Sequence, residues 1–226
     1  RERAWHYILG MEQQITELID LDLELFWVDR RDLIVSSSDV IVEDGRFVPE
    51  WYDNDGSGYT YGLELMLRHD FSRRLYGWIA YTLSRSRIRS SPDESFIPTS
   101  FDQTHILTIV AQGRLPWDIG LGLRFRLVSG NPYTPVIDAL LDTDTASYTP
   151  IYGQPNSRRL PTFHQLDLRI DKRFVFNRWI LTLYLEIINT YNAENVEFYT
   201  WDYRYRERRD FVLLPIVPSL GVKGEF

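Results

Sequence analysis

The chain has 226 residues, of which 44% are hydrophobic, 25% are charged and 15% are aromatic. Its longest apolar runs fall well short of the roughly 20 residues that a membrane-spanning helix needs, which excludes a helical membrane protein. The chain has no cysteine, which excludes disulfides and thiolate metal sites, and its net charge of −7 disfavours a nucleic-acid partner.

Apolar and polar residues alternate along most of the chain, as they do in β-strands that have one apolar face. In residues 18–29 the odd positions are apolar until Trp27, and the even positions begin Asp20, Asp22 and Glu24. A helix would scatter these acids around its circumference, whereas a strand places them on one face. Nine strands are therefore predicted: 3–15, 18–34, 57–70, 74–88, 101–115, 117–131, 159–174, 178–203 and 213–226.

Short and long connections alternate between these strands. The short ones are predicted at 14–18, 69–74, 114–118 and 174–178, and the long polar ones at 30–56, 85–100, 129–158 and 190–214. One end of the sheet should therefore have short turns and the other end long loops. No helix and no linker is predicted, so residues 1–226 are expected to form one domain.

The apolar faces fit either the core of a soluble sandwich or barrel, or the lipid around a membrane barrel. Three features favour the membrane: the apolar faces vary little in residue size, charged residues occupy the middle of the opposite faces, and aromatic residues gather near strand ends. We therefore predict an all-β fold, an antiparallel transmembrane β-barrel. The strand-end aromatic residues are Trp27, Trp117, Phe174, Trp179, Tyr203 and Phe226.

The polar faces should line the lumen of this barrel. The lumen-facing residues are predicted to be Asp20, Asp22, Glu24, Glu64, Arg68, Arg124, Arg126, Asp167, Arg169, Asp171 and Glu186. The acidic stripe at 20–24 fits a wall facing water or protein better than a Ca²⁺ or cation site. Arg124 and Arg126, with Arg169 and Asp171 on the following strand, are expected to form bracing ion pairs rather than an anion site.

No catalytic centre, metal site or cofactor is predicted. The four histidines are scattered, and the nearest approaches to a pairing are Asp102 with His105 and His164 with Asp167. Neither has the spacing of a metal site or a nucleophile beside a base, so we do not expect an enzyme.

Four stretches occur in a specific order: SFDQTHILTIVAQGRLP from Ser100, SGNPYTPV from Ser129, NSRRLPTFHQLDLRIDKRFVF from Asn156, and PSLGVKGEF from Pro218. Together they resemble the carboxyl-terminal barrel of TonB-dependent outer-membrane receptors. The resemblance runs from residue 57 to residue 226, and residues 1–56 fit as the preceding hairpin.

The resemblance implies a Gram-negative outer membrane, a barrel of about 22 strands, an amino-terminal plug domain, and energised import of a scarce nutrient such as a metal chelate, cobalamin or a glycan. It also implies several partners: outer-membrane lipid and lipopolysaccharide, the remaining amino-terminal portion of the receptor, TonB through that portion, and the outer-membrane assembly machinery. That machinery is expected to read the terminal aromatic residue, Phe226.

The chain departs from this pattern because it has no plug, no TonB box and too few strands. It also opens at Arg1 without an initiator methionine or signal peptide. We expect the carboxyl-terminal part of a receptor. The alternatives are a small independent outer-membrane barrel acting as an adhesin, porin-like channel or enzyme, and a soluble β-rich carbohydrate-binding domain.

The predicted extracellular loops contain the candidate ligand residues. Residues 199–210 mix tyrosine, tryptophan and arginine, which fits stacking on a sugar or aromatic ligand, or contact of Arg204, Arg206, Arg208 and Arg209 with lipopolysaccharide phosphates. A solvated hairpin above the membrane is the plainer alternative. The candidates are Tyr133, Trp201, Tyr203, Arg204 and Arg206.

Overall fold

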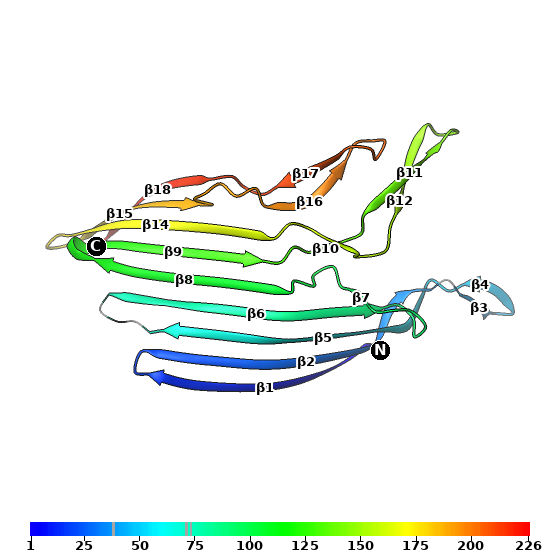
Figure 1. Cartoon of the computed structure of the whole chain (residues 1–226), viewed down its shortest axis with the longest axis horizontal. Coiled ribbons are helices and arrows are strands. Elements are labelled where there is room, and N and C mark those ends of the chain that lie inside the picture. The colour runs from blue at the N-terminus through cyan, green and yellow to red at the C-terminus, as the bar shows by residue number, and fades with distance from the viewer. Residues whose placement is uncertain (38, 71, 73) are drawn as a thin grey trace.

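The computed structural model describes residues 1–37, 39–70, 72 and 74–226. Nine long antiparallel strands form one sheet, in which each strand pairs with its neighbours in chain order (Figure 1). These strands are β1 (Arg3–Thr16), β2 (Ile19–Ser36), β5 (Tyr52–His69), β6 (Leu75–Arg89), β8 (His105–Leu115), β9 (Ile119–Val128), β14 (Phe163–Val175), β15 (Ile180–Ile188) and β18 (Val217–Glu225).

Shorter strands lie in the connections. β3 (Val40–Glu43) pairs with β4 (Arg46–Pro49), β11 (Val136–Asp142) with β12 (Ser147–Tyr152), and β16 (Val196–Trp201) with β17 (Arg208–Val212). Two-residue strands β10 (Pro132–Tyr133) and β13 (Arg158–Arg159) pair, and β7 (Ile97–Pro98) pairs with β6. A 3₁₀ turn at Pro116–Asp118 is the one helical element of the described chain, and no helix there is long and apolar enough to cross a membrane.

The predicted number of long strands is confirmed, but one predicted strand is wrong. Residues 178–203 do not form a single strand, because β15 ends at Ile188 and the chain leaves the sheet at Asn189. The Asn189 side chain accepts a hydrogen bond from the backbone N–H of Ala193 and so stabilises a turn. Tyr203 consequently lies in a loop hairpin and not at the end of a sheet strand.

The alternation of short and long connections is confirmed in the described residues. Short connections lie at one end of the sheet, called here the turn end, and long connections at the other, called the loop end (Figure 1). The predicted turn at 69–74 includes Phe71 and Arg73, which lie outside the described residues. The described amino terminus lies at the loop end and the carboxyl terminus at the turn end.

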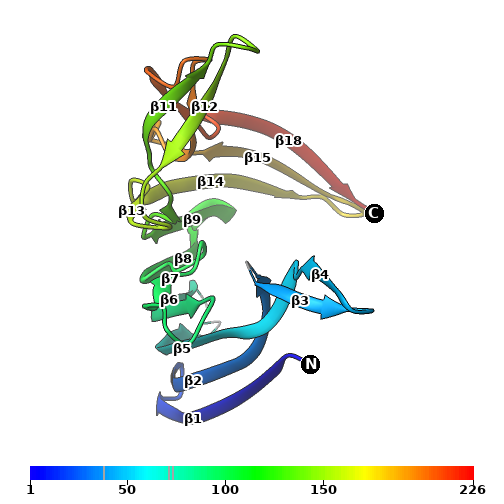
Figure 2. The same cartoon turned by 90° about the vertical axis from the view of Figure 1, so that its right-hand side faces the viewer.

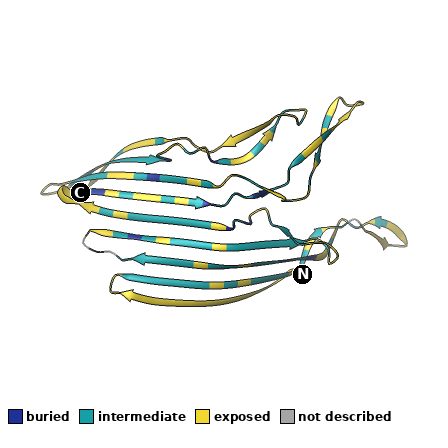
Figure 3. Ribbon diagram, viewed as in Figure 1, coloured by how far each residue is buried: buried dark blue, intermediate teal, exposed yellow. Residues whose placement is uncertain are grey.

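The sheet is a single curved layer. Figure 2 shows it bending around one side, with the β3–β4 hairpin leaning over the concave surface. Val128, 5% exposed, is the one buried hydrophobic residue among those described, and Figure 3 shows how few positions are buried. A soluble sandwich would bury the apolar faces of two sheets against each other. No such core exists in the described part of the chain.

The register divides the sheet into two faces, because directly opposite residues of antiparallel strands lie on the same face. One row across the sheet joins Leu23, Leu65, Tyr81, Leu107 and Leu127. These residues define the apolar face.

A second row belongs to the opposite, polar face. It joins Asp20, Arg68, Trp78, Val110, Arg124 and Asp167 across six strands. All eleven residues predicted to share a lumen wall lie on this polar face.

A buried ion pair joins three segments of the chain at the loop end. The Asp102 side chain is fully buried, accepts a hydrogen bond from the backbone N–H of Ser86 at 2.7 Å, and pairs with Arg159. Arg159 also donates to the backbone carbonyls of Asp102 and Gly130. The pair therefore connects β6, the chain entering β8, and β13.

Arg159→Ala should lower the free energy of unfolding by about 3 kcal/mol, because it removes the nearer of the two arginines that contact the buried Asp102 carboxylate. We expect the lower end of the range for buried pairs, since the Arg159 side chain is itself 32% exposed. Urea unfolding of the purified receptor, followed by tryptophan fluorescence, measures the change. Arg158→Ala is the matched control, because this neighbouring side chain is exposed. Equal losses in both variants would contradict the assignment.

Candidate functional site

The polar face carries ion pairs between neighbouring strands. Arg124 on β9 contacts Asp167 on β14 at 2.6 Å, and Asp167 is only 7% exposed. Asp167 also accepts hydrogen bonds from Gln165 and from the backbone N–H of Asn189. A charge-assisted pair with these additional donors satisfies the carboxylate and joins β9, β14 and the end of β15.

Two further arginines of this face also contact neighbouring side chains. Arg68 contacts Asp20 at 2.9 Å. Arg169 lies 3.6 Å from Glu186, 4.0 Å from Asp171 and 4.1 Å from the centre of the Tyr184 ring.

Ion pairs are therefore present at Arg124 and Arg169, and Asp171 is the one partner that the sequence analysis had named with them. Arg126 differs, since its guanidinium lies 5.4 Å from the centre of the Phe163 ring and forms no ion pair with a described residue.

The acidic stripe lines an open hollow on the polar face. Asp22, Glu24 and Glu64, together with Glu12 of β1, border a cavity of about 560 Å³. Within the described ranges, no three His, Asp or Glu side chains are arranged to hold a metal ion. The hollow is thus an acidic part of the polar face.

A cavity of about 410 Å³ lies among the loops. Six aromatic residues from two connections, β9–β14 and β15–β18, line it: Tyr133, Tyr152, Phe198, Tyr199, Trp201 and Tyr205. Glu197 is the one charged residue of the lining, and the rest is small, apolar or neutral polar. This composition suits a ligand with flat rings and a few hydrogen-bonding groups.

Packing holds the cavity rings in place. Tyr133 meets Tyr199 edge-on, with ring centroids 5.0 Å apart, and the Arg208 guanidinium lies 4.0 Å from the centre of the Tyr199 ring. Burial raises the pKa of Tyr199, so its phenol stays protonated and can donate a hydrogen bond at neutral pH. Residues far apart in sequence thereby form one wall.

The loop cavity continues toward the polar face. A second hollow of about 240 Å³ shares Asn131, Leu160 and Glu197 with the first. Its floor includes Arg126 and Phe163, which belong to the polar face of the sheet. The two hollows therefore adjoin, one among the loops and the other reaching the polar face.

Only two of the five predicted ligand residues line this cavity, namely Tyr133 and Trp201. Tyr203 and Arg204 lie at the tip of the β16–β17 hairpin, where the Tyr203 ring faces Tyr148 and Arg204 bonds to the Tyr203 hydroxyl. Arg206 is part of the same turn. These three residues do not line the cavity, and their role as ligand residues stays a prediction.

Sequence reasoning missed Tyr152, Phe198, Tyr199 and Tyr205. The dense aromatic run from Phe198 to Tyr205 was the signal that could have found three of them.

Two of the histidines singled out in the sequence each pair with a tyrosine. His105 is hydrogen-bonded through Nδ1 to the Tyr81 hydroxyl at 2.8 Å, and His164 to that of Tyr191 at 2.9 Å. Asp102 and Asp167, their supposed partners, are bound instead by Arg159 and Arg124.

The two-faced sheet and its loops can now be compared with known proteins. A family model described as "TonB dependent receptor-like, beta-barrel" matches residues 1–189. The chain belongs to this family. Its nine long strands are therefore part of an antiparallel transmembrane β-barrel, and the resemblance found in the sequence motifs is confirmed. No match was found among curated proteins.

Solved receptors share the fold at low sequence identity. The ferric-catecholate import receptor Fiu of Escherichia coli matches with a TM-score of 0.66 and 15% identity, over 99% of this chain and 27% of its own. The ferric yersiniabactin uptake receptor FyuA of Yersinia pestis matches with a TM-score of 0.64 and 15% identity, over 99% of this chain and 29% of its own. The outer membrane transporter YddB of Escherichia coli matches with a TM-score of 0.66 and 13% identity, over 99% of this chain and 32% of its own. The chain thus spans about a third or less of their length.

The tip of the β16–β17 hairpin should respond to pH through Asp202. Its carboxylate accepts hydrogen bonds from the backbone N–H groups of Glu207 at 3.0 Å and Arg206 at 2.7 Å, which hold the pKa of Asp202 below its usual range. Because the folded pKa is lowered, the turn should keep these bonds at neutral pH and lose them only as the pH falls through that lowered pKa.

Hydrogen exchange, expressed as protection factors for the Arg206 and Glu207 amides, tests this expectation. Asp202→Ala should remove the protection at every pH. The assignment is wrong if protection disappears at the ordinary pKa of an aspartate, or if the variant keeps it.

Proposed function

We propose that residues 1–226 are the carboxyl-terminal barrel portion of a TonB-dependent transporter in a Gram-negative outer membrane, which takes up a scarce nutrient. The observation that carries this proposal is the division of the nine-strand sheet into a mainly apolar face and a mainly polar face. Only a barrel in lipid needs its apolar face on the outside.

In this proposal the apolar face contacts lipid and the polar face lines the lumen. Aromatic side chains mark both borders of the apolar face, as in outer-membrane barrels. At the loop end Trp27, Tyr59 and Tyr61 stack with centroids 5.4 to 6.1 Å apart, and at the turn end Trp179 stacks between Phe176 and Phe226. The eleven predicted wall residues then face the lumen, with the loop end outside the cell.

The remaining wall would come from further strands of the same receptor. Within the described residues β1 pairs only with β2, and β18 only with β15, so two edges stay open. Open edges are not tolerated in hydrocarbon. In a barrel of about 22 strands, further strands would pair with the open edges of β1 and β18. A plug that contacts TonB would fill this barrel.

The aromatic loop cavity is proposed as the entrance for the nutrient. Fiu and FyuA are described as receptors for ferric catecholate and ferric yersiniabactin, so an iron chelate is the first nutrient to test. The six rings of the cavity would stack on ring-bearing parts of such a ligand, and Tyr199 would donate a hydrogen bond.

Uptake of radiolabelled iron chelates by cells with the complete receptor tests the proposal. Uptake should require TonB, and Trp201→Ala should raise the half-saturating concentration roughly threefold to tenfold through lost stacking. Tyr203→Ala is the matched control, because its ring lies outside the cavity. TonB-independent uptake would contradict the transporter assignment. A chain that is folded and monomeric by itself in detergent would favour a small independent barrel.

Phe226 is proposed as the residue that the assembly machinery reads. Its side chain is fully exposed beyond β18 and stacks on Trp179. Phe226→Ala should reduce the receptor in the outer membrane severalfold, whereas Phe176→Ala, which removes an aromatic residue of the same cluster, should have a smaller effect. Immunoblots of outer-membrane fractions measure both variants, and unchanged amounts of the Phe226 variant would count against the assignment.

A further inference from the structure

Three asparagines at a spacing of three residues follow β15: Asn189, Asn192 and Asn195, called here the asparagine clamp. Asn189 and Asn195 are buried, with 0% and 4% of their surface exposed. None of the three lines the aromatic loop cavity, whose nearest lining residue along the chain is Glu197. The clamp therefore lies directly before the β16–β17 hairpin, which carries four of the six cavity rings.

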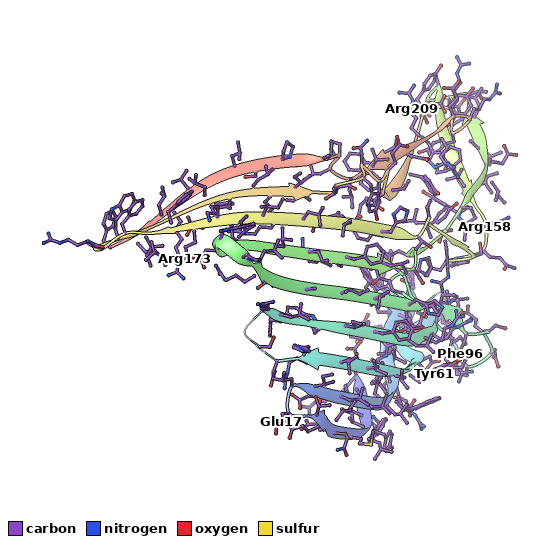
Figure 4. The ribbon with its side chains drawn as sticks, turned by 60° about the vertical axis from the view of Figure 1, so that its left-hand side comes forward. Glu17, Tyr61, Phe96, Arg158, Arg173 and Arg209 are labelled. Carbon is purple, nitrogen blue, oxygen red and sulfur yellow. The ribbon has the colours of Figure 1, made fainter. Side chains whose placement is uncertain are left out.

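The β16–β17 hairpin does not belong to the nine-strand sheet. Among the described residues β16 pairs only with β17, so no strand hydrogen bond joins the hairpin to the sheet. Beyond its base, two edge-on aromatic contacts connect it to the β9–β14 connection. Figure 4 shows Arg209 of the hairpin and Arg158 of that connection at the loop end, away from Arg173 at the turn end. The position of the hairpin therefore depends on how its base is held.

The clamp joins the two legs of the hairpin at this base. The backbone carbonyl of Asn195 accepts a hydrogen bond, the side-chain amide of Asn189 donates one, and the side-chain oxygen of Asn192 accepts one. Their partners are backbone groups that follow β17, namely the N–H of Leu213, the carbonyl of Leu214 and the N–H of Ile216, at 2.8, 3.1 and 2.9 Å. Both legs are thus held by the same three residues.

The clamp is also fixed to β14 of the sheet. The Asn195 side chain accepts a hydrogen bond from the backbone N–H of His164 and donates one to its carbonyl, both at 3.0 Å. The backbone N–H of Asn189 donates to the Asp167 carboxylate at 2.9 Å. Asp167 lies on the polar face and pairs with Arg124, so this face and the hairpin base share one hydrogen-bond network.

Backbone geometry favours asparagine at two of the three positions. Asn189 and Asn192 have φ values of 54° and 53°, a region that asparagine tolerates better than most residues. Alanine at position 189 would therefore add backbone strain to the loss of hydrogen bonds. Asn195 does not adopt this conformation, so replacing it removes the side-chain contacts alone.

We propose that the asparagine clamp, fixed by Asp167, positions the β16–β17 hairpin so that its rings face those of the β9–β14 connection around the ligand. The inference rests on the proposed function, because that function makes the aromatic loop cavity the nutrient entrance. The clamp residues are positioning residues, since they act through the hairpin rings and do not line the cavity. A hairpin held at its base needs less ordering when a ligand binds, which strengthens binding.

Distance measurements between spin labels on two hairpin tips test the positioning directly. Cysteines at position 144, in the β11–β12 turn, and at position 206, in the β16–β17 turn, carry the labels, and both native side chains are exposed. The complete receptor, with any other cysteine replaced, should give a narrow distance distribution. Asn195→Ala should broaden this distribution by several ångström, because the hairpin loses its connection to His164.

A second clamp variant and a matched control accompany this measurement. Asn189→Gly removes the side-chain bonds without backbone strain and should broaden the distribution as well. Asn54→Ala is the control, because its amide also donates to a backbone carbonyl, that of Asp32, but on the β2–β5 pair. All variants are first checked for native folding by heat-modified mobility in gels. Unchanged distributions in both clamp variants, or equal broadening in the control, would overturn the proposal.

Calorimetric titration of the purified receptor with a ferric catecholate measures the consequence for binding. Asn195→Ala should raise the Kd roughly fivefold to tenfold. Combined with Trp201→Ala, it should cost less than the product of the two single losses, because both changes act on the same cavity wall. Fully independent losses would show that the clamp does not act through the hairpin rings. If the unchanged receptor does not bind the chelate, the nutrient assignment fails, and the label distances still decide the role of the clamp.

Discussion

The antiparallel register of the long strands is the constraint on which the rest of this structure depends. A slip of one residue between two strands would move every acid and arginine of one strand to the apolar face. The pairing of β2 with β5 has no shift from Leu21 to Trp27; its shifts lie beyond Arg31, toward the loop end, and the pairing of β2 with β1 shifts between Gln14 and Thr16 at the turn end. Irregular pairing is thus confined to the part of the strand outside the apolar band.

Polar contacts replace a hydrophobic core in the described chain. The buried side chains are mainly Asp102, Thr104, Asp167, Asn189 and Asn195, and each of the two buried acids is paired with an arginine. Asn195 bonds to both backbone groups of His164, which joins the β15–β18 connection to the start of β14. Such contacts are strong where water is scarce, and they hold long loops over a sheet that offers no interior to pack against.

The sequence predicted the sheet because its evidence is local. Period-two alternation identifies a strand and its faces without knowledge of its neighbours, so all eleven wall residues could be assigned to one face. The division at Asn189 was missed because a buried asparagine turn has no periodicity. The β3–β4 hairpin was also missed, although Asp44 and Gly45, both with positive φ, form a typical hairpin turn.

The loop cavity could not be predicted in the same way. Tyr133, Tyr152 and Tyr199 come from three segments whose meeting depends on the Asp102–Arg159 pair and on hairpin packing, and neither leaves a pattern in the sequence. Arg159 stood within a recognisable motif, yet its partner is 57 residues away. Long-range contacts between irregular segments are the part of this fold that only the structure supplies.

The central claim is that the odd-numbered residues of β2 face lipid and the even-numbered residues face the lumen. The 226 residues have no cysteine, so single cysteines at positions 21 to 25 can carry a spin label in the complete receptor in membranes once any cysteine outside this chain is replaced. Oxygen, which concentrates in lipid, should relax the labels at 21, 23 and 25 more strongly than those at 22 and 24. Stronger relaxation of the labels at 22 and 24, or equal relaxation at all five positions, would contradict the account.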